Sequence, residues 1–504
     1  MTLLLSAVIF CIFVMSLDMT IVGTAIPKIT DDFDGLEQVP WYGSAYFMTF
    51  GGFQSSWGKV YRYVPLKITY LLTMALFEIG SLVCATAPNA TAFIVGRAIA
   101  GLGGAGIAAG GYTVIALSSR PERRPVYVGA IGTTYGVAAV LGPVLGGVFS
   151  DRVTWRWCFY INLPIGIAAT AVILLLFKVP GNARITVPAT WREKLLQTDP
   201  VGVALTMAAI ICFILAMQAG GQSHPWNSGY VIGLLVASII LMILLVPWEI
   251  FQKERAMVVP RLIKQRFLWS SSIYQFCYGA SYNVLLYYLP IYFQSVDNVS
   301  PIESGVRNLP MVIAVSLGNV AGGFLMSKTG YPVPPMIAGA AIATVSSGLF
   351  YTLDIGTSDG KWIGYQILAG VAWSIPFQYS LNIAQANVEP QDISSATAII
   401  FFAQIIGQAF ALSAAQSAFV NVLINYLSAN APHISTAEVI TTGATGFRTA
   451  FPPDQVLEIV RGYMEGVRAT FAVAIGLAGV SFLSAFLVPF RKMGGGKPET
   501  PAGE

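Results

Sequence analysis

The stretch AAVLGPVLGG, residues 138–147, decides the fold class because it puts small residues and a proline inside a long apolar run. Gly142 and Gly146 are four residues apart, the spacing at which small side chains let two membrane helices approach closely. Gly147 extends this small surface. Pro143 frees a backbone carbonyl, so it permits a bend that neighbouring helices can stabilise. Taken alone, the stretch predicts a closely packed membrane helix.

The composition of the whole chain agrees with a membrane protein. Of its 504 residues, 55% are hydrophobic and only 10% are charged, whereas soluble domains are about a quarter charged. A spanning helix needs ~20 apolar residues, and runs of that kind recur from end to end. Disorder and coiled coil require more polar or more periodic sequences. A net charge of +4 is too small to indicate nucleic-acid binding.

We predict an all-α integral membrane protein with about fourteen spans. The division we expect is a six-helix half over 1–178, a linker with two extra spans over 179–268, and a second six-helix half over 269–490. A long outward loop is expected at about 420–462, and a tail at 491–504. The spans are placed near residues 3–24, 41–57, 66–87, 92–117, 126–149, 157–178, 200–219, 229–251, 269–293, 305–327, 335–353, 361–387, 394–419 and 463–489.

The basic residues predict the orientation. Most of the 28 Lys and Arg residues fall in one set of connections, which the positive-inside rule makes cytoplasmic, so both termini are expected inside. Two glycosylation sequons, at Asn89 and Asn298, then lie in outward connections. The basic stretch 252–268 is expected either to set topology or to lie along the membrane surface. We expect the plasma membrane, but the sequence carries no address that we can decode, and a vacuolar or vesicle membrane would require the same features.

The sequence offers no residues for a metal site, a catalytic triad or nucleotide binding. The five cysteines lie in or beside apolar runs without a CxxC pair, as packing residues do. The two histidines lie in polar connections, so no metal site or catalytic triad can be assembled, and we expect neither an enzyme nor a cofactor. No P-loop is present to hold a nucleotide. If the chain moves solutes across the membrane, the energy would therefore come from an ion gradient or from the gradient of the solute itself.

Of the charged residues inside predicted spans, Asp18, Glu78 and Arg97 are the candidates for a functional role, whereas Glu249 and Glu465 lie near span ends, where a charge is cheap. A charge at the membrane midplane costs ~3 kcal/mol or more, so each of the first three is a candidate for proton coupling or gating. The alternatives are structural: a hydrogen bond for Asp18, an ion pair that locks two helices for Arg97, and a position facing away from the centre for Glu78.

The sequence resembles the fourteen-span drug:proton antiporter family of the major facilitator superfamily, particularly its fungal toxin and multidrug efflux members. Residues 138–147 are similar to the antiporter motif, with Ala138 in place of its first glycine. Residues 97–105, RAIAGLGGA, resemble motif B, with alanine in place of its usual glutamine. The segments 17–27 (LDMTIVGTAIP) and 155–164 (WRWCFYINLP) also resemble this family.

One motif departs from the family pattern. Residues 58–67, GKVYRYVPLK, occupy the place of motif A, but Arg62 replaces its aspartate and Pro65 replaces its second glycine. The resemblance therefore does not carry over an ion pair that depends on that aspartate.

The resemblance implies a major facilitator fold of two pseudo-symmetric halves and an extra central helix pair, with the substrate held at the midplane between the halves. A wall of tyrosine and amide side chains without fixed charge suits bulky, largely neutral molecules. The alternative for the aromatic residues is a lipid-facing or interfacial position. The expected lining residues are Tyr46, Gln54, Tyr135, Tyr274, Gln275, Tyr278, Asn283, Trp373, Gln378, Asn382, Gln404 and Gln408.

The functional expectation is export of a small organic molecule, such as a toxin, drug or secondary metabolite, by proton antiport. The rival within transport is an uptake carrier for a siderophore or an amino acid, and the rival outside it is a membrane sensor. The partners expected are the lipid bilayer, the substrate and protons, with no nucleic acid. The family resemblance implies a monomer.

Overall fold

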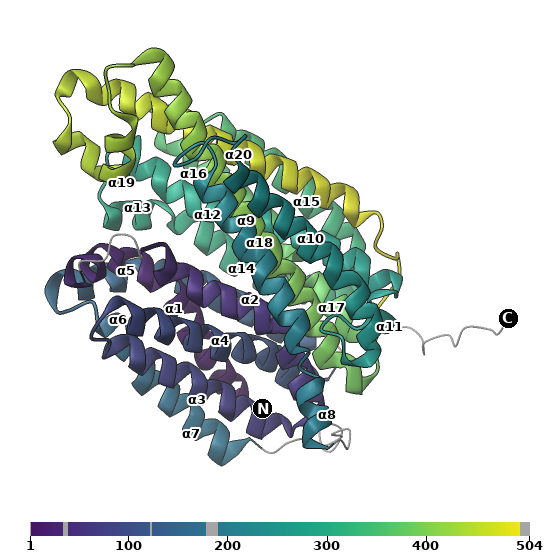
Figure 1. The fold of residues 1–504 in the computed structure, drawn as a ribbon. Coiled ribbons are helices and arrows are strands. Elements are labelled where there is room, and N and C mark those ends of the chain that lie inside the picture. The colour runs from purple at the N-terminus through teal and green to yellow at the C-terminus, as the bar shows by residue number, and fades with distance from the viewer. Residues whose placement is uncertain (1, 34–38, 121–122, 178–189, 494–504) are drawn as a thin grey trace.

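A computed structural model describes residues 2–33, 39–120, 123–177 and 190–493. All named secondary-structure elements in this part of the chain are helices. The first group of helices, here the N-terminal half, is drawn from purple to blue in Figure 1. It comprises α1 (Thr2–Phe33), α2 (Val39–Tyr63), α3 (Leu66–Ala85), α4 (Ala90–Ser118), α5 (Arg124–Arg152), α6 (Trp157–Tyr160) and α7 (Asn162–Leu176).

A short helix, α8 (Trp191–Leu196), leads to the extra pair, α9 (Pro200–Ala219) and α10 (Gly229–Gln252), and then to η3 (Lys253–Arg255) and α11 (Pro260–Ile263). The remaining helices form the C-terminal half. They are α12 (Arg266–Ser295), α13 (Pro301–Arg307), α14 (Leu309–Thr329), α15 (Val333–Tyr351), α16 (Asp359–Phe377), α17 (Tyr379–Ala386), η4 (Pro390–Asp392), α18 (Ile393–Asn430), α19 (Thr436–Ala450) and α20 (Pro453–Ala485).

Helices pack mainly within their own half. In the N-terminal half α3 and α2 pack on α4, and α1 packs on α5; in the C-terminal half α12 packs on α18 and α20, and α14 on α16. The halves meet where α5 contacts α14 and α2 contacts α18. Helix α9 contacts both α2 and α18, so the extra pair lies against both halves (Figure 1).

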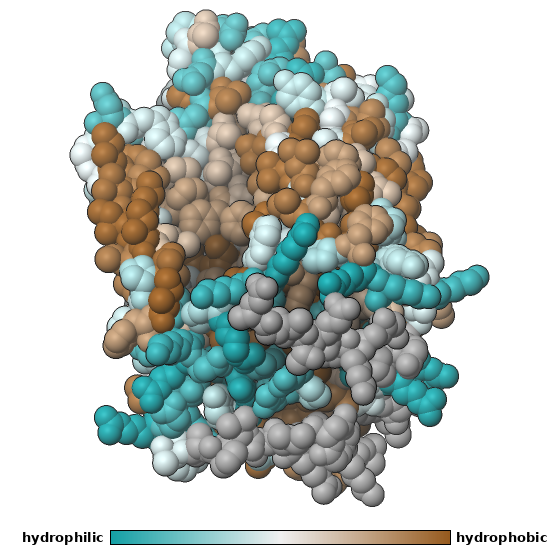
Figure 2. Space-filling model, turned by 90° about the vertical axis from the view of Figure 1, so that its right-hand side faces the viewer, coloured by the Kyte–Doolittle hydropathy of each residue, from teal (hydrophilic) through white to brown (hydrophobic). Residues whose placement is uncertain are grey.

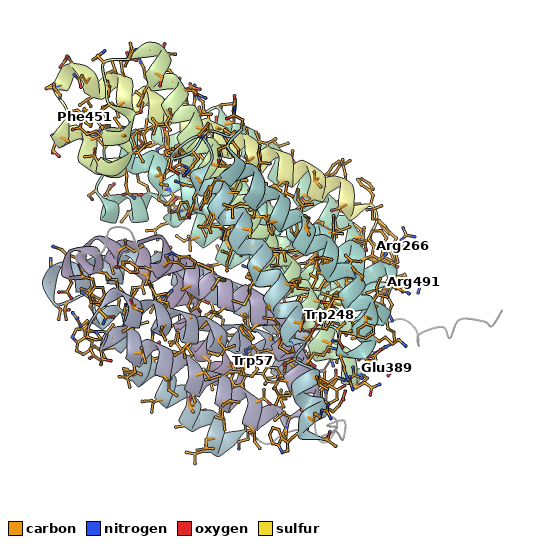
Figure 3. The ribbon with its side chains drawn as sticks, in the orientation of Figure 1. Trp57, Trp248, Arg266, Glu389, Phe451 and Arg491 are labelled. Atoms are coloured by element: carbon orange, nitrogen blue, oxygen red, sulfur yellow. The ribbon has the colours of Figure 1, made fainter. Side chains whose placement is uncertain are left out.

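The residues labelled in Figure 3 mark the two ends of the bundle. Arg266, Glu389 and Arg491 lie together at one end, beside α11, while Phe451 lies at the other end, beside α19 (Figure 3). We call the first the basic end and the second the opposite end. Figure 2 shows polar residues gathered across the lower part of one face and apolar residues above them. This division is typical of a protein whose apolar belt lies in lipid.

Eleven helices in the described part of the chain are long and apolar enough to cross a membrane. Helices α2, α12 and α16 are not among them, because tyrosine, serine and glutamine side chains interrupt their apolar sequence. They nevertheless coincide with predicted spans, and they pack inside the bundle. Helices at the centre of a bundle can carry polar residues that a lipid-facing helix cannot.

Most of the stretch 420–462, expected as a long outward connection between two spans, is helical. Helix α18 continues to Asn430, α19 fills Thr436–Ala450, and α20 begins at Pro453. The 38 residues of α18 correspond to about 57 Å at 1.5 Å per residue, more than the ~30 Å hydrocarbon core. The spans were predicted from apolar runs, and these mark only the part of a helix that lies in the hydrocarbon core. The polar ends of α18 and α20 outside that core were therefore not predicted as helix.

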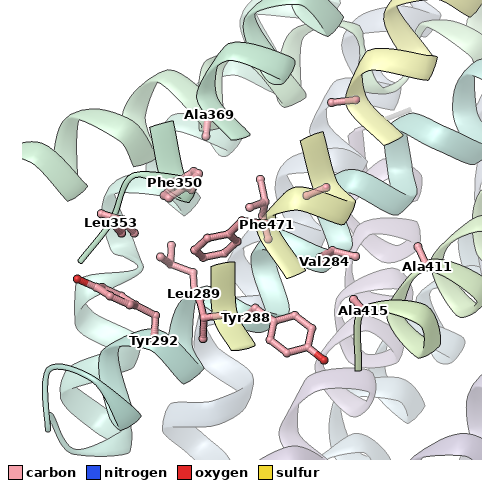
Figure 4. Packing of buried hydrophobic residues seen from close by; sticks show 14 of the residues in the cluster. Val284, Tyr288, Leu289, Tyr292, Phe350, Leu353, Ala369, Ala411, Ala415 and Phe471 are labelled. Atoms are coloured by element: carbon pink, nitrogen blue, oxygen red, sulfur yellow. The ribbon is translucent and has the colours of Figure 1, made fainter. Parts of the chain in front are cut away.

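The hydrophobic cores of the two halves are largely separate. The larger cluster contains only residues of the C-terminal half, including Phe350 and Phe471, whose ring centroids are 5.9 Å apart (Figure 4). The main cluster of the N-terminal half also includes Leu381, Phe401 and Ile405 of the other half. Each half can therefore keep its own core while the smaller contact between them changes.

Candidate functional site

The structure brings Asp18 of α1 and Arg97 of α4 together as an ion pair inside the N-terminal half. Arg97 Nη1 lies 2.6 Å from Asp18 Oδ2, and both side chains are 0% exposed. Arg97 Nε also donates to the Tyr42 carbonyl at 3.1 Å, and Asn162 Nδ2 donates to Asp18 Oδ1 at 3.2 Å. Both oxygens of Asp18 therefore accept hydrogen bonds. Such pairing is what makes two buried charges tolerable in an apolar bundle.

Small residues and an aromatic ring position the guanidinium. The Arg97 guanidinium lies over the Tyr46 ring, 4.4 Å from its centroid, in a cation–π contact. A Cβ at Gly101 would lie 2.3 Å from the Tyr46 carbonyl oxygen, so the glycine allows α2 to approach α4 this closely. Among the described residues Arg97 Nη2 has no hydrogen-bond partner. The pair therefore leaves one guanidinium nitrogen available.

Glu78 on α3 lies outside this ion pair. Both of its carboxyl oxygens are buried, and neither has a hydrogen-bond partner in the described part of the chain. The carboxyl group rests on α7 at Gly166, where a Cβ would lie 1.6 Å from Glu78 Oε1. Sequence reasoning missed Gly166, Asn162 and Ser81, which surround the charged residues; Asn162 was visible only as a polar residue within the segment 155–164.

The antiporter-motif residues join α5 to α1. A Cβ at Gly142 would lie 2.1 Å from Thr20 Oγ1, and that hydroxyl donates to the Ala138 carbonyl at 3.1 Å. Gly146 is buried, and Gly147 has no atom within 4 Å of its Cβ position. Helix α5 is continuous through Pro143, whose side chain lies outside the described residues. Gly142 is thus the member of the motif that makes the close approach.

Several predicted lining residues meet around α12 and α18. Gln275 Nε2 donates to Gln404 Oε1 at 2.9 Å, and a Cβ at Gly279 would lie 3.7 Å from Gln408 Nε2. Gln378 Nε2 donates to the Tyr112 hydroxyl at 3.2 Å, a bond that joins the two halves. Sequence reasoning did not select Tyr112.

Other predicted lining residues have contacts within one half. The Tyr278 hydroxyl donates to Ala372 O at 2.6 Å, and the stacked Tyr274 donates to Met336 O at 3.4 Å. Tyr274, Tyr278 and Trp373 all belong to the hydrophobic cluster of the C-terminal half. Their contacts are therefore typical of core residues. Gln54 is fully buried, and its amide has no partner among the described residues. Asn382 is buried, while Tyr135 and Asn283 are half-buried.

A second group of charges lies at the basic end, and we call it the basic-end cluster: Lys59, Arg62, Glu254, Arg261 and Asp392. Asp392, only 1% exposed, accepts from Arg261 Nη2 at 3.0 and 3.1 Å and lies 3.2 Å from Arg62 Nη1. Arg261 Nε also lies 2.8 Å from Glu254 Oε1, and Lys59 donates to the Glu254 carbonyl. The hydrogen bond that Arg261 donates to the Glu254 carboxylate raises the pKa of Arg261, so its guanidinium stays charged.

The basic-end cluster joins three parts of the chain. Lys59 and Arg62 belong to α2, Glu254 and Arg261 to the segment after the extra pair, and Asp392 to the C-terminal half. Arg62 therefore has an ion-pair partner although it replaces the aspartate of motif A. The sequence did not single out Asp392, because an acidic residue in a short connection looks like a solvated loop residue.

The halves also touch closely near the basic end. A Cβ at Gly58 would lie 2.4 Å from the Ala398 Cβ, and the rings of Tyr112 and Phe401 are 4.7 Å apart. Together with the basic-end cluster, these contacts hold the halves together at this end.

The two sequon asparagines are exposed. Asn89 caps α4, with its Oδ1 accepting from Ala92 N at 2.9 Å, and Asn298 has a positive φ of 58°. Glycosylation at either remains a prediction. The residues that the structure describes contain no group of three or more His, Cys, Asp or Glu side chains that could hold a metal ion.

Comparison with known sequences gives relatives that match nearly the whole of this chain. The family model described as Major Facilitator Superfamily matches residues 8–412. The chain is 55% identical over 97% of its length to the Penicillium sp protein named "MFS-type transporter grgE", covering 86% of that protein. It is 49% identical to "Probable efflux pump gsfJ" of Penicillium aethiopicum, covering 97% of this chain and 88% of the relative.

Solved structures share the fold at low identity. The human organic anion transporter MFSD10 (TETRAN) superposes with a TM-score of 0.63 at 13% identity, covering 97% of this chain and 99% of that one. The proton:xylose symporter XylE gives a TM-score of 0.61 at 12% identity, with 97% and 96% covered. At this level of identity the likeness concerns the arrangement of helices alone.

Proposed function

This chain belongs to the major facilitator superfamily, and on that premise we propose that it exports small organic molecules by proton antiport with alternating access. The observation that carries the proposal is the fully buried Asp18–Arg97 pair, 2.6 Å apart inside the N-terminal half. Ionisable groups within a membrane bundle are costly, and in transporters they mark ion pathways. The names of the relatives, which include efflux pumps, support the direction of transport.

The substrate class follows from the amide groups. Gln275, Gln404 and Gln408 lie close together on α12 and α18, and Gln54 offers an unpartnered amide on α2. Amides donate and accept hydrogen bonds without a fixed charge. A bulky, moderately apolar, largely neutral molecule with several carbonyl or hydroxyl groups is the substrate that this chemistry fits.

Alternating access would open and close the contact between the halves. The basic-end cluster and the Tyr112–Gln378 bond would hold the closed state at the basic end. In the orientation we propose, this end and both termini face the cytoplasm, the Asn89 and Asn298 sequons face outward, and the protein works as a monomer in the plasma membrane.

The test is dye flux in proteoliposomes with an imposed pH gradient. Rhodamine 6G serves as a cationic probe and Nile red as a neutral one. The wild type should move at least one dye against its gradient when the compartment receiving it is acidic, since protons would leave as the dye enters. Asp18→Asn should abolish this accumulation, because it removes the counter-charge of Arg97.

The matched control is Glu465→Gln, which removes the partner of Arg468 at 2.6 Å in a partly exposed pair. It should keep gradient-driven accumulation. Wild-type flux that ignores the pH gradient would contradict antiport and indicate facilitated diffusion. Accumulation when the dye-receiving compartment is alkaline, with dye and protons moving together, would instead indicate an uptake carrier.

A further inference from the structure

We propose that Glu78 is the proton-carrying group of this transporter and that Ser81 and Asn162 connect it to the Asp18–Arg97 pair. The inference rests on the proposed function, since it identifies which carboxyl group exchanges the proton. It also defines a polar track between α3 and α7 that lies beside the ion pair.

The track follows from helix geometry. Glu78 and Ser81 are one turn apart on α3, and Asn162 and Gly166 are one turn apart on α7, so each pair shares a helix face. Asn162 Nδ2 donates to Ser81 Oγ at 3.1 Å and to Asp18 Oδ1 at 3.2 Å. One turn along, the Glu78 carboxyl rests on Gly166. A polar line therefore runs from Glu78 past Ser81 and Asn162 to Asp18.

The balance of charges supports a bound proton in this group of residues. Asp18, Glu78 and Arg97 carry two acidic groups and one guanidinium, so the set is neutral only when one carboxyl is protonated. Asp18 accepts from both Arg97 and Asn162, whereas neither oxygen of Glu78 has a donor among the described residues. An ionised carboxylate without a donor is strongly disfavoured in an apolar bundle. The proton therefore resides on Glu78.

The pocket around Glu78 fits a neutral acid. Gly166 is the residue that leaves room, because a Cβ there would overlap Glu78 Oε1, and the Met74 methyl group lies 3.3 Å from that Cβ position. On the α7 side the carboxyl group therefore faces a glycine, with an apolar methionine beside it. Helix α3 itself also carries Lys67, Tyr70 and Cys84. The ionisable groups on the neighbouring helices are Cys11, Asp18, Lys28, Asp31 and Asp32 on α1, Tyr42, Tyr46, Lys59, Tyr61, Arg62 and Tyr63 on α2, Arg97 and Tyr112 on α4, and Cys158 and Tyr160 on α6; α7 has none.

Coupling follows from competition for Arg97. Its Nη2 has no partner among the described residues, so an ionised Glu78 could be stabilised if the guanidinium turned toward it. Substrate contact that loosens the Asp18–Arg97 bond would promote this exchange. The O–H bond of Glu78 then breaks and its proton goes to water on the open side. On the other side, loss of substrate restores the pair and Glu78 takes up a proton.

The experiment has a transport arm and a spectroscopic arm. In proteoliposomes loaded with rhodamine 6G or Nile red, Glu78→Gln should lose accumulation driven by a pH gradient. It should retain dye exchange between equal pH values, because exchange needs no net proton movement. Asn162→Ala should reduce gradient-driven accumulation and likewise retain dye exchange at equal pH. Glu465→Gln should leave both unchanged.

In the spectroscopic arm, infrared spectra of the purified protein are compared with those of Glu78→Gln. The difference should show the C=O band of a protonated carboxylic acid in the wild type, with no dye present. Gly166→Ala should shift this band, since it crowds the carboxyl group, and this second variant serves if Glu78→Gln does not fold.

The outcomes separate the two proposals. Wild-type flux that ignores pH overturns the proposed function, and the infrared band then still reports whether Glu78 is protonated. Gradient-driven accumulation that survives Glu78→Gln overturns this inference alone. A difference spectrum without a protonated-acid band also overturns it.

Discussion

The Asp18–Arg97 pair and the basic-end cluster both hold a buried aspartate against arginine, but they join different parts of the molecule. Asp18 and Arg97 belong to one half, and both are fully buried. Asp392 is nearly as buried, yet its partners Arg62 and Arg261 come from the other half and from the linker. Movement of the halves does not itself separate a pair inside one half, whereas it must break a pair between them. The first therefore suits coupling, and the second suits gating.

The largest effect on stability is expected from Asp18→Asn, because it leaves the Arg97 guanidinium buried without a counter-charge. Breaking a buried pair by removing one partner costs ~3–5 kcal/mol. Thermal unfolding of the purified protein in detergent should show a marked loss of stability. Glu465→Gln, in the partly exposed pair with Arg468, should cost less than ~1 kcal/mol. Equal losses in the two variants would remove the distinction between buried and exposed pairs.

The next effect concerns the packing that holds α5 against α1. Gly142→Ala should cost ~1–3 kcal/mol, because its Cβ would overlap the Thr20 hydroxyl. Gly147→Ala is the matched control, since nothing lies within 4 Å of its Cβ position. Thermal unfolding and dye flux measured side by side should show both losses for Gly142→Ala only. A harmless Gly142→Ala would show that the approach of α5 to α1 is not critical.

Asp392→Asn is expected to change conformation more than stability, because its partners remain near the basic end and can reach water when the halves part. Losing ~1.4 kcal/mol from the closed state would shift the equilibrium about tenfold. The distance between the halves can be measured by double electron–electron resonance between spin labels at positions 120 and 328. Arg120 and Lys328 are exposed and lie near the basic end, one in each half. Cys212, the least buried cysteine, is replaced by serine so that it is not labelled. The variant should add a population at longer distance. Identical distance distributions would argue against a gate.

The smallest effect is expected from Arg62→Gln. Arg261 alone still makes two hydrogen bonds to Asp392, so the aspartate keeps a partner. The same labels should report a smaller shift than for Asp392→Asn, and the double variant Arg62→Gln with Arg261→Gln should exceed the sum of the singles. Strict additivity would mean that the two arginines do not share Asp392.

Local sequence patterns predicted much of this molecule. Apolar runs located the helices, and the family motifs indicated the fold that the comparisons then supported. The sequence also indicated Asp18 and Arg97 individually, because charged residues stand out in apolar segments. Their pairing could not be predicted, since they lie 79 residues apart and meet only through the packing of α1 on α4.

Features that depend on three-dimensional packing were missed. Asp392 looked like a loop residue in the sequence. Its ion pairs with Arg62 and Arg261 form only when the chain is folded. Gly166 looked like any glycine in a span, and only its position opposite Glu78 gives it meaning. The tyrosines at 274 and 278 looked suited to a binding site, yet their hydroxyls bond to backbone within one half.

Substrate-driven proton movement tests the central claim most directly. Vesicles containing the wild type would hold a trapped pH indicator, with equal pH on both sides. A gradient of the transported dye, outward or inward, would then be imposed suddenly. The account predicts proton movement opposite to the dye, abolished by Asp18→Asn and altered only in rate by Asp392→Asn. A wild type that moves dye without moving protons, or an Asp18→Asn variant that still moves them, would contradict it.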